Sequence, residues 1–133
     1  MPTDDDLYTA RLLKFWDPRY FGFHRCAYTH GASETSPVCG DEVEFRLVLK
    51  DDQLEVVDVK AHGCCVSECC AAMLADLVCD RPLSWINHFL SDDHWTQYVN
   101  VPLGKSRRDS CMMLPLRCLR KALVAPYQSV SDA

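Results

Sequence analysis

The sequence predicts an α+β fold, in which helices cover one face of a small, mainly antiparallel sheet of three strands. Two patterns predict it. Residues 41–61 contain two runs of alternating apolar and polar residues separated by a turn, which is typical of a hairpin. Residues 65–79 and 110–124 carry apolar side chains at helical spacing, as expected for helices that cover one face of the sheet.

The composition is that of an ordinary globular protein. The chain has 133 residues, 48% hydrophobic and 25% charged. We therefore expect one domain over residues 1–133, with a core from about 7 to 124 and loose ends.

Charge and hydropathy exclude two classes of partner. The formal net charge of −5 argues against nucleic-acid binding, which needs a clustered positive surface. No apolar run is long enough to cross a bilayer, and the acidic start of the chain is unlike a secretory signal. We expect a cytoplasmic protein, a monomer or weak homo-oligomer, whose thiols stay reduced.

The first third of the chain predicts one helix and an irregular segment. Residues 5–16 have a helical apolar pattern, which ends at Asp17-Pro18 because the residue before proline avoids helical angles. Residues 17–38 contain Pro, Gly, Ser and several aromatic residues, which indicate an irregular, partly extended segment. The third strand is expected within this segment, near residues 25–30.

The hairpin is the clearest local signal. Val43, Phe45 and Leu47 alternate with charged residues over 41–49, which predicts a half-buried strand. Residues 51–53 form the turn, and residues 54–61 form the second strand.

Helices account for most of the rest. Gly63 ends the second strand, residues 65–79 predict a helix that Arg81-Pro82 terminates, and residues 83–90 predict a short one. Residues 91–109 read as polar loop. Pro115 is tolerated only in a first turn, so the last helix is expected to begin near Leu114, just after Cys111.

The nine cysteines do not match a standard metal-binding motif. Their number is odd, which excludes complete pairing within the chain. Zinc ribbons and thioredoxin-like sites need C-x2-C, whereas this chain has two adjacent pairs separated by C-x3-C. Spacing alone therefore identifies no site.

Their location is more informative. Cys39 and Asp41 lie where the first hairpin strand begins, and Cys64 lies where the second ends and a helix begins. Antiparallel pairing brings these ends together at one edge of the sheet. A helix N-terminus lowers the pKa of a nearby thiol, and Cys111 also precedes a predicted helix. These four residues are the candidate ligands, with core packing of the cysteines as the alternative.

Several motifs carry a family resemblance. Residues 17–22, DPRYFG, are similar to an N-P-R-x-x-G segment, and Cys39-Gly40-Asp41 matches C-G-D. Gly63-Cys64, followed by Ser67 and the small-residue helix 71–78, matches a second ligand motif. In this order, over about residues 7–124, they resemble the iron–sulfur cluster assembly scaffolds IscU, SufU and the N-terminal part of NifU.

The third cysteine ligand could be Cys111 or Cys118. The family pattern R-x-x-C-x-x-L favours Cys111, with Arg108 and Leu114 in register. Ser110 stands where IscU members have His and SufU members have Lys, so the subtype stays open.

The resemblance implies a function and a site. A metal or a transient cluster of the 2Fe–2S type would bind to Cys39, Asp41, Cys64 and Cys111, with donor atoms within about 4–5 Å of one another. The scaffold would accept sulfur from a cysteine desulfurase and pass the cluster to apo-proteins, acting as a carrier rather than as an enzyme. The alternatives are a zinc-bound sulfur acceptor of the SufU type, which carries no cluster, and a non-catalytic interaction module.

The remaining thiols and imidazoles have simpler interpretations. Cys69 and Cys70 are expected in the core, where a buried thiol behaves as a small hydrophobic group. Cys79 is expected to be structural, Cys65 to be a bystander near the site, and His62 either to support the site or to be unrelated to it. Cys26 shows no partner in the sequence.

Overall fold

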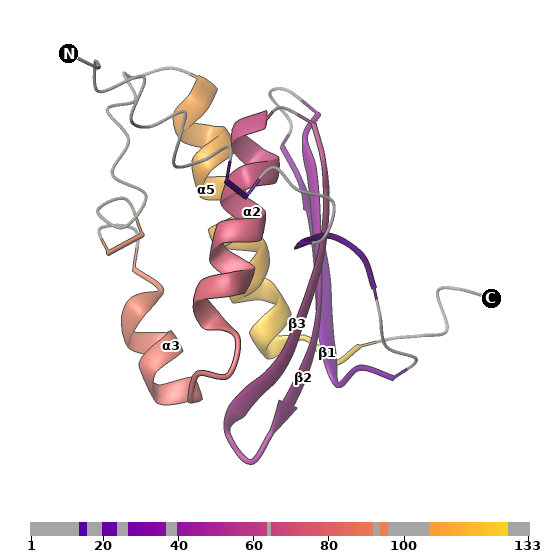
Figure 1. The fold of residues 1–133 in the computed structure, drawn as a ribbon, viewed down its shortest axis with the longest axis vertical. Helices are drawn as coiled ribbons and strands as arrows, with labels where there is room; N and C mark the ends of the chain where they lie inside the picture. Colours follow the sequence, from indigo (N-terminus) through magenta and orange to yellow (C-terminus); the bar gives the residue numbers. More distant parts are fainter. Residues whose placement is uncertain are drawn as a thin grey trace.

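The structure, a computed structural model, confirms the predicted α+β fold (Figure 1). It describes residues 14–15, 20–23, 27–36, 40–63, 65–91, 94–95 and 107–127. The predicted helix at 5–16 falls almost wholly outside them. The elements are β1 (His30–Thr35), β2 (Glu42–Lys50), β3 (Gln53–His62), α2 (Cys65–Val78), α3 (Leu83–Phe89) and α5 (Arg107–Val124).

The sheet has the strand order β1-β2-β3, and both pairings are antiparallel. The hairpin register pairs Lys50 with Gln53 across a two-residue turn. Asp51 and Asp52 both have positive φ, 54° and 61°, as a two-residue hairpin turn of type I′ requires. The predicted hairpin is therefore confirmed.

The first strand lies later in the chain than we predicted. It spans His30–Thr35 rather than residues 25–30. Its sequence, HGASET, has neither β-branched alternation nor an apolar run, so nothing local identifies it as a strand. Pairing with β2, from His30 opposite Leu47 to Thr35 opposite Glu42, makes it one.

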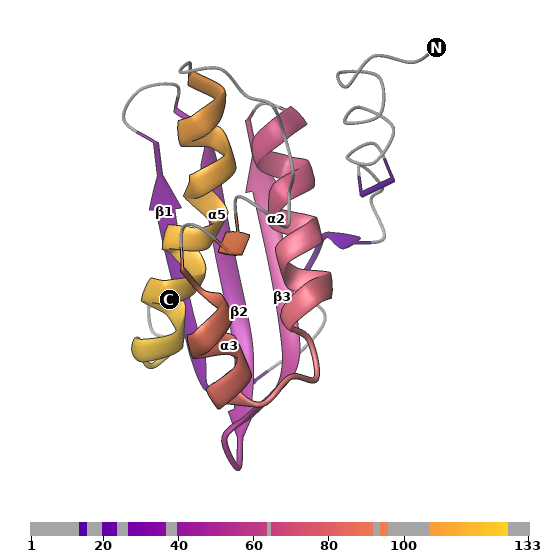
Figure 2. The ribbon, with the colours of Figure 1, turned by 90° about the vertical axis from the view of Figure 1, so that its left-hand side faces the viewer.

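The helices cover one face of the sheet, as expected (Figure 2). Helix α5 packs on β1 and β2, and α2 packs on β3 and α5. The inward-facing residues Val43, Phe45 and Leu47 are completely or almost completely buried beneath them. The core thus lies between the sheet and the α2–α5 layer.

Backbone hydrogen bonds hold the hairpin end of the sheet against the α2–α3 connection. Asp80, which follows α2 with a φ of 65°, donates its N–H to the carbonyl of Leu54 at 2.8 Å. The N–H of Leu83 donates to the carbonyl of Asp52 at 2.7 Å. The opposite end of the sheet, where β2 begins and β3 ends, carries Asp41, one of the candidate ligands.

Helix α5 begins earlier than the sequence predicted. It starts at Arg107 rather than near Leu114, so Cys111 lies within the helix instead of before it. Pro115 is consequently an interior residue. It has no N–H to donate to the carbonyl of Cys111, four residues earlier, but the buried residues Leu114, Leu116 and Leu119 hold this part of the helix in the core. Tertiary burial outweighs the local helix defect.

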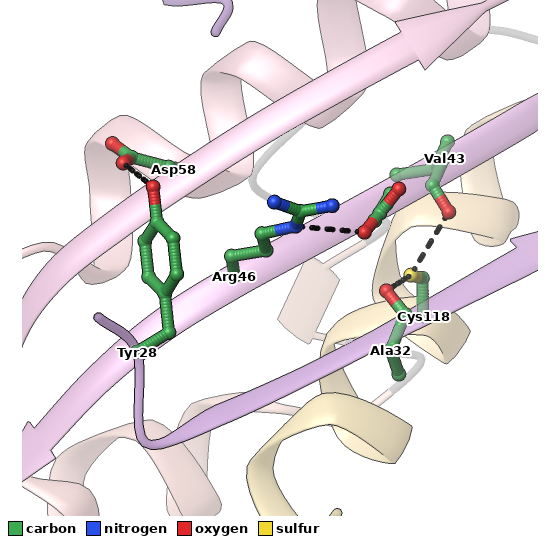
Figure 3. Close-up of polar contacts among 7 residues, drawn as sticks. Tyr28, Ala32, Val43, Arg46, Asp58 and Cys118 are labelled. Atoms are coloured by element: carbon green, nitrogen blue, oxygen red, sulfur yellow. Dashed lines mark hydrogen bonds and ion pairs between the residues drawn. The ribbon is translucent and has the colours of Figure 1, made fainter. Parts of the chain in front are cut away.

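The outer face of the sheet carries an aromatic and charged cluster (Figure 3). The guanidinium carbon of Arg46 lies 3.9 Å from the ring centroid of Phe23, and its Nε donates to Glu44 at 2.9 Å. The hydroxyl of Tyr28 donates to Oδ2 of Asp58 at 2.8 Å. These contacts fasten the segment before β1 to the sheet, on the side opposite the helices.

Candidate metal-binding edge of the sheet

Asp41 is the predicted ligand whose side chain the structure describes. It directly precedes β2 and is only 4% exposed. Its Oδ2 accepts a hydrogen bond of 2.6 Å from the hydroxyl of Ser67, a completely buried residue in the first turn of α2. Hydrogen bonds to an ionised carboxylate are short and stronger than neutral ones. The pair therefore joins the start of β2 to the start of α2.

Gly63 makes room for this carboxylate. Its φ of +149° is one that side-chain-bearing residues rarely adopt, and a Cβ here would overlap the Asp41 carboxyl group. The N–H of Gly63 also donates to Oε2 of Glu68, one turn into the helix, at 3.2 Å. Glycine is required here, and the Asp41 carboxylate lies against the residue that precedes Cys64 in the chain.

The loop before β2 is closed by its own backbone. The N–H of Gly40 donates to the carbonyl of Ser36 at 2.9 Å, and the N–H of Ser36 donates to the carbonyl of Asp41 at 2.8 Å. Gly40 takes a φ of +75°, in the left-handed region that favours glycine. Cys39 belongs to this short connection between β1 and β2.

The described residues include only one of the three candidate cysteines. Cys39 and Cys64 lie outside the described residues, and Cys111 is described as part of α5 without its side chain. Within the described part of the chain, no three or more His, Cys, Asp or Glu side chains form a group that could hold a metal ion. The convergence of all four ligands stays a prediction.

Cys118, the alternative third ligand, lies in the core. It is completely buried, and its Sγ lies 3.4 Å from the carbonyl oxygen of Ala32 and 3.3 Å from that of Val43 (Figure 3). Burial raises the pKa of this thiol to about 12. A protonated thiol packed between α5 and the sheet has the properties of a structural group, and the assignment of the third ligand to Cys111 stays a prediction.

The other cysteines divide by burial. Cys69 and Cys70 are completely buried in α2, as predicted. Cys79, directly after α2, is half-buried, and burial is the main cause that raises its pKa. Cys65 is the first residue of α2, but its side chain, like the whole of Cys26, is outside the description.

His62 ends β3 on the outer side of this edge. It is exposed, pairs with Glu42 in the sheet register and borders an open groove of about 1090 Å³. The groove is also lined by charged residues of both hairpin strands, Glu44 of β2 and Lys60 of β3, and by Glu68 of α2. A supporting role for His62 stays a prediction.

The sequence alone did not indicate that Ser67 contacts a candidate ligand at this edge. Ser67 entered only as part of a motif, without a role. The spacing gave a signal, because a residue three positions after Cys64 falls in the first turn of the predicted helix, where backbone groups need polar partners. Its partner could not be identified, because Asp41 is 26 residues away in the chain.

The comparisons with known proteins agree with the fold. The family described as NifU-like N terminal domain matches residues 7–131. The chain therefore belongs to this family, which confirms the predicted resemblance to iron–sulfur cluster assembly scaffolds at the level of the family. Among curated proteins, none matches the chain at a significant level.

Solved structures with the same fold share little sequence with the chain. One, described as an iron–sulfur cluster assembly scaffold protein for the SUF system of Fervidobacterium islandicum AW-1, has a TM-score of 0.70 at 16% identity. The match covers 84% of this chain and 93% of that one. The N-terminal part of a NifU-like protein from Brucella abortus gives 0.70 at 16% identity, covering 90% and 93% respectively.

Among the described helices, none is both long and apolar enough to cross a bilayer.

Proposed function

We propose that this protein is an iron–sulfur cluster assembly scaffold that holds its cargo at the edge formed by the start of β2 and the end of β3. The ligands are Cys39, Asp41, Cys64 and Cys111. The observation that carries the proposal is the buried carboxylate of Asp41, which lies against Gly63. Asp41 is two residues after Cys39, and Gly63 is one residue before Cys64, so two candidate thiols belong to the segments that meet there.

The ligand chemistry suits a cargo that must leave. Thiolates are soft donors that bind iron–sulfur clusters and zinc, whereas a carboxylate is a harder donor. A permanent cluster site is usually closed by four cysteines. In a set of three thiolates and one carboxylate, the carboxylate is the ligand that exchanges most easily. Asp41 is therefore the group that opens the site to an acceptor.

The proposed protein is a carrier rather than an enzyme. It receives sulfur from a cysteine desulfurase, assembles a transient cluster of the 2Fe–2S type, and passes it to apo-proteins in the cytoplasm. The groove beside His62 borders the same edge and offers room and both signs of charge to a partner. We further propose that residues 1–133 form one domain.

Metal analysis of protein purified without oxygen tests the cargo. Iron together with sulfide supports the scaffold. Zinc alone would favour a zinc-bound sulfur acceptor, and neither metal would indicate an interaction module that has lost the chemistry.

The exchangeable-ligand role is tested with Asp41→Ala. The thiolates should still retain metal, while the rate at which a chelator or an apo-acceptor removes it should change. Asp58→Ala is the matched control, because Asp58 is also buried, at 9% exposure, and also accepts a hydroxyl, but lies on the outer face of the sheet. Equal rates and equal metal content in wild type and Asp41→Ala would defeat the proposal for Asp41.

The cysteine assignments are tested by pairing a candidate ligand with a core thiol on the same helix. Cys111→Ala should sharply weaken zinc or cluster binding. Cys118→Ala should cost stability and leave metal content unchanged, because Cys118 is buried against carbonyls of β1 and β2. The reverse result would show that Cys118 is the ligand.

A further inference from the structure

The two oxygens of the Asp41 carboxylate lie in different surroundings. Oδ2 accepts the hydroxyl of Ser67 at 2.6 Å. Oδ1 is the oxygen closest to the position that a Cβ of Gly63 would occupy, so it lies beside the backbone that leads into Cys64. One oxygen is thus engaged by α2, and the other lies toward the junction between β3 and α2.

We propose that Ser67 is a positioning residue, whose hydroxyl holds Oδ2 of Asp41 so that Oδ1 is the oxygen that binds the cargo metal. This inference rests on the proposed function, because it assumes that Asp41 is a ligand. It assigns a role to a residue that does not itself contact the metal.

The burial of the pair makes this hydroxyl effective. Ser67 is completely buried and Asp41 is 4% exposed, so bulk water competes poorly for the hydrogen bond. Ser67 lies on a helix whose neighbouring residues Cys69 and Cys70 are also completely buried, which fixes the position of its side chain. A carboxylate held at one oxygen by a rigid donor has lost most of the freedom to rotate about its side-chain bonds.

Gly63 and Glu68 complete the arrangement from the other side. The Glu68 carboxylate accepts the N–H of Gly63, which fixes the backbone that Oδ1 faces. Because Gly63 has no Cβ, nothing of its own side chain separates Oδ1 from that backbone. The carboxylate is therefore confined between a hydroxyl and a glycine.

Single-oxygen binding fits the geometry of the proposed site. Four-coordinate zinc is tetrahedral, and three thiolates leave one position for one oxygen. Hydrogen-bonded partners that orient metal ligands typically change metal affinity by about 10–100-fold when they are removed. We expect an effect near the lower end, because the thiolates supply most of the binding.

The test measures zinc affinity by competition with a chelator, without oxygen. Four proteins are compared with wild type: Ser67→Ala, Asp41→Ala, the double variant, and Tyr28→Phe as control. Tyr28→Phe is matched to Ser67→Ala, because it also removes a hydroxyl from a buried carboxylate, that of Asp58. Ser67→Ala removes one oxygen atom, and alanine has the highest helix propensity, so the fold should persist. Circular dichroism checks this.

The expected result is specific to a positioning role. Ser67→Ala should raise the zinc dissociation constant about tenfold, and Tyr28→Phe should leave it unchanged. The double variant should match Asp41→Ala alone, because Ser67 acts only through Asp41. Additive losses in the double variant would overturn the inference.

Cobalt substitution gives a second readout that a general loss of stability would not move. Tetrahedral Co²⁺ absorbs in the visible range with an intensity and position that depend on its donor atoms. The spectrum of Ser67→Ala should shift toward that of Asp41→Ala, and the spectrum of Tyr28→Phe should remain that of wild type.

The outcomes separate this inference from the proposed function. If Asp41→Ala alters zinc affinity and the cobalt spectrum but Ser67→Ala alters neither, the positioning role is wrong and the ligand assignment stands. If Ser67→Ala binds zinc more tightly, the hydroxyl competes with the metal and the inference is again overturned. If Asp41→Ala changes neither measurement, the ligand assignment itself fails, and the role of Ser67 fails with it.

Discussion

Among the described residues two carboxylates, Asp41 and Asp58, are buried, and each accepts a hydrogen bond from a hydroxyl group. Asp41, at the start of β2, accepts the hydroxyl of Ser67, and Asp58, in the middle of β3, accepts the hydroxyl of Tyr28. Their surroundings differ. Asp58 lies opposite Arg46 in the sheet register, within a cluster of aromatic rings, whereas Asp41 lies against a glycine beside a candidate ligand cysteine.

The comparison shows that a buried acid is not by itself evidence of a site. Burial and a hydroxyl donor are common to both residues, so neither property distinguishes a ligand from a structural group. The distinction lies in what surrounds the carboxylate: Asp58 lies opposite Arg46 in the sheet register, and Asp41 lies against the glycine that precedes Cys64 in the chain. The predictions below separate the two regions, beginning with the largest expected effect.

The first prediction concerns Gly63, the glycine that lies against the Asp41 carboxylate. Gly63→Ala should lower the free energy of unfolding by about 3 kcal/mol or more, since it combines an unfavourable φ with overlap on the Asp41 carboxyl group. Gly40→Ala is the control, because its φ is also positive but no atom of the described residues lies within 4 Å of the position that its Cβ would take. It should cost about 1 kcal/mol. Urea unfolding with a chelator present measures both, and equal losses would mean that the overlap is relieved at little cost.

The second prediction compares the two hydroxyl donors. In the metal-free protein, Ser67→Ala and Tyr28→Phe should each lower the free energy of unfolding by about 2 kcal/mol, the usual range for a hydrogen bond to a charged group. Unfolding in urea measures this. When zinc is added, Ser67→Ala should gain less stabilisation than Tyr28→Phe, because the stabilisation of the folded state by a bound metal increases with the logarithm of its affinity. Identical gains would remove the difference between the two regions.

The third prediction concerns the buried thiol of Cys118, which shows how burial affects a titratable group that is not a carboxylate. Its pKa is about 12 in the folded protein and 9.0 for the unperturbed group. Between these values the folded state keeps a proton that the unfolded state loses, so stability should fall as the pH rises above about 9. The slope attributable to this thiol approaches about 1.4 kcal/mol per pH unit.

Cys118→Ala isolates that slope. The difference in unfolding free energy between wild type and the variant should shrink steadily from pH 9 upward. Denaturant unfolding at several pH values below about 11 measures it. A difference that is constant with pH would mean that the Cys118 thiol ionises in the folded protein as it does in water.

The smallest expected effect belongs to an exposed carboxylate. Glu34 pairs with Lys121 at 3.5 Å, and the lysine side chain is 58% exposed. Glu34→Gln should change the unfolding free energy by about 0.5 kcal/mol or less, and by still less in about 1 M salt. A loss comparable to that of Tyr28→Phe would show that charge, rather than burial, governs the cost at Asp58.

Local patterns in the sequence predicted much of the fold. The alternation from Val43 to Leu47 identified β2, and the run from Cys65 to Val78 without Gly or Pro identified α2. Strand β1 was placed too early because its formation depends on pairing with β2. The start of α5 was placed too late because the rule for Pro115 is local, whereas burial of the surrounding leucines is not.

The candidate site was predictable in outline but not in detail. Antiparallel pairing alone brings Asp41 near the residue before Cys64, and the structure agrees for the described Asp41 and Gly63. The Ser67 hydrogen bond and the overlap at Gly63 depend on the exact distance between α2 and the sheet edge. Side-chain packing across elements sets that distance, and no spacing in the chain encodes it.

The core position of Cys118 has a consequence for oxidative damage. Peroxides attack thiolates rather than thiols. Because the pKa of the Cys118 thiol is about 12, the ionised fraction of this thiol at neutral pH is only about one part in 10⁵. Cys69 and Cys70 are shielded by complete burial. A chain with nine cysteines therefore exposes fewer targets to oxidants than its composition indicates, and oxidation would concentrate on the thiols outside the core.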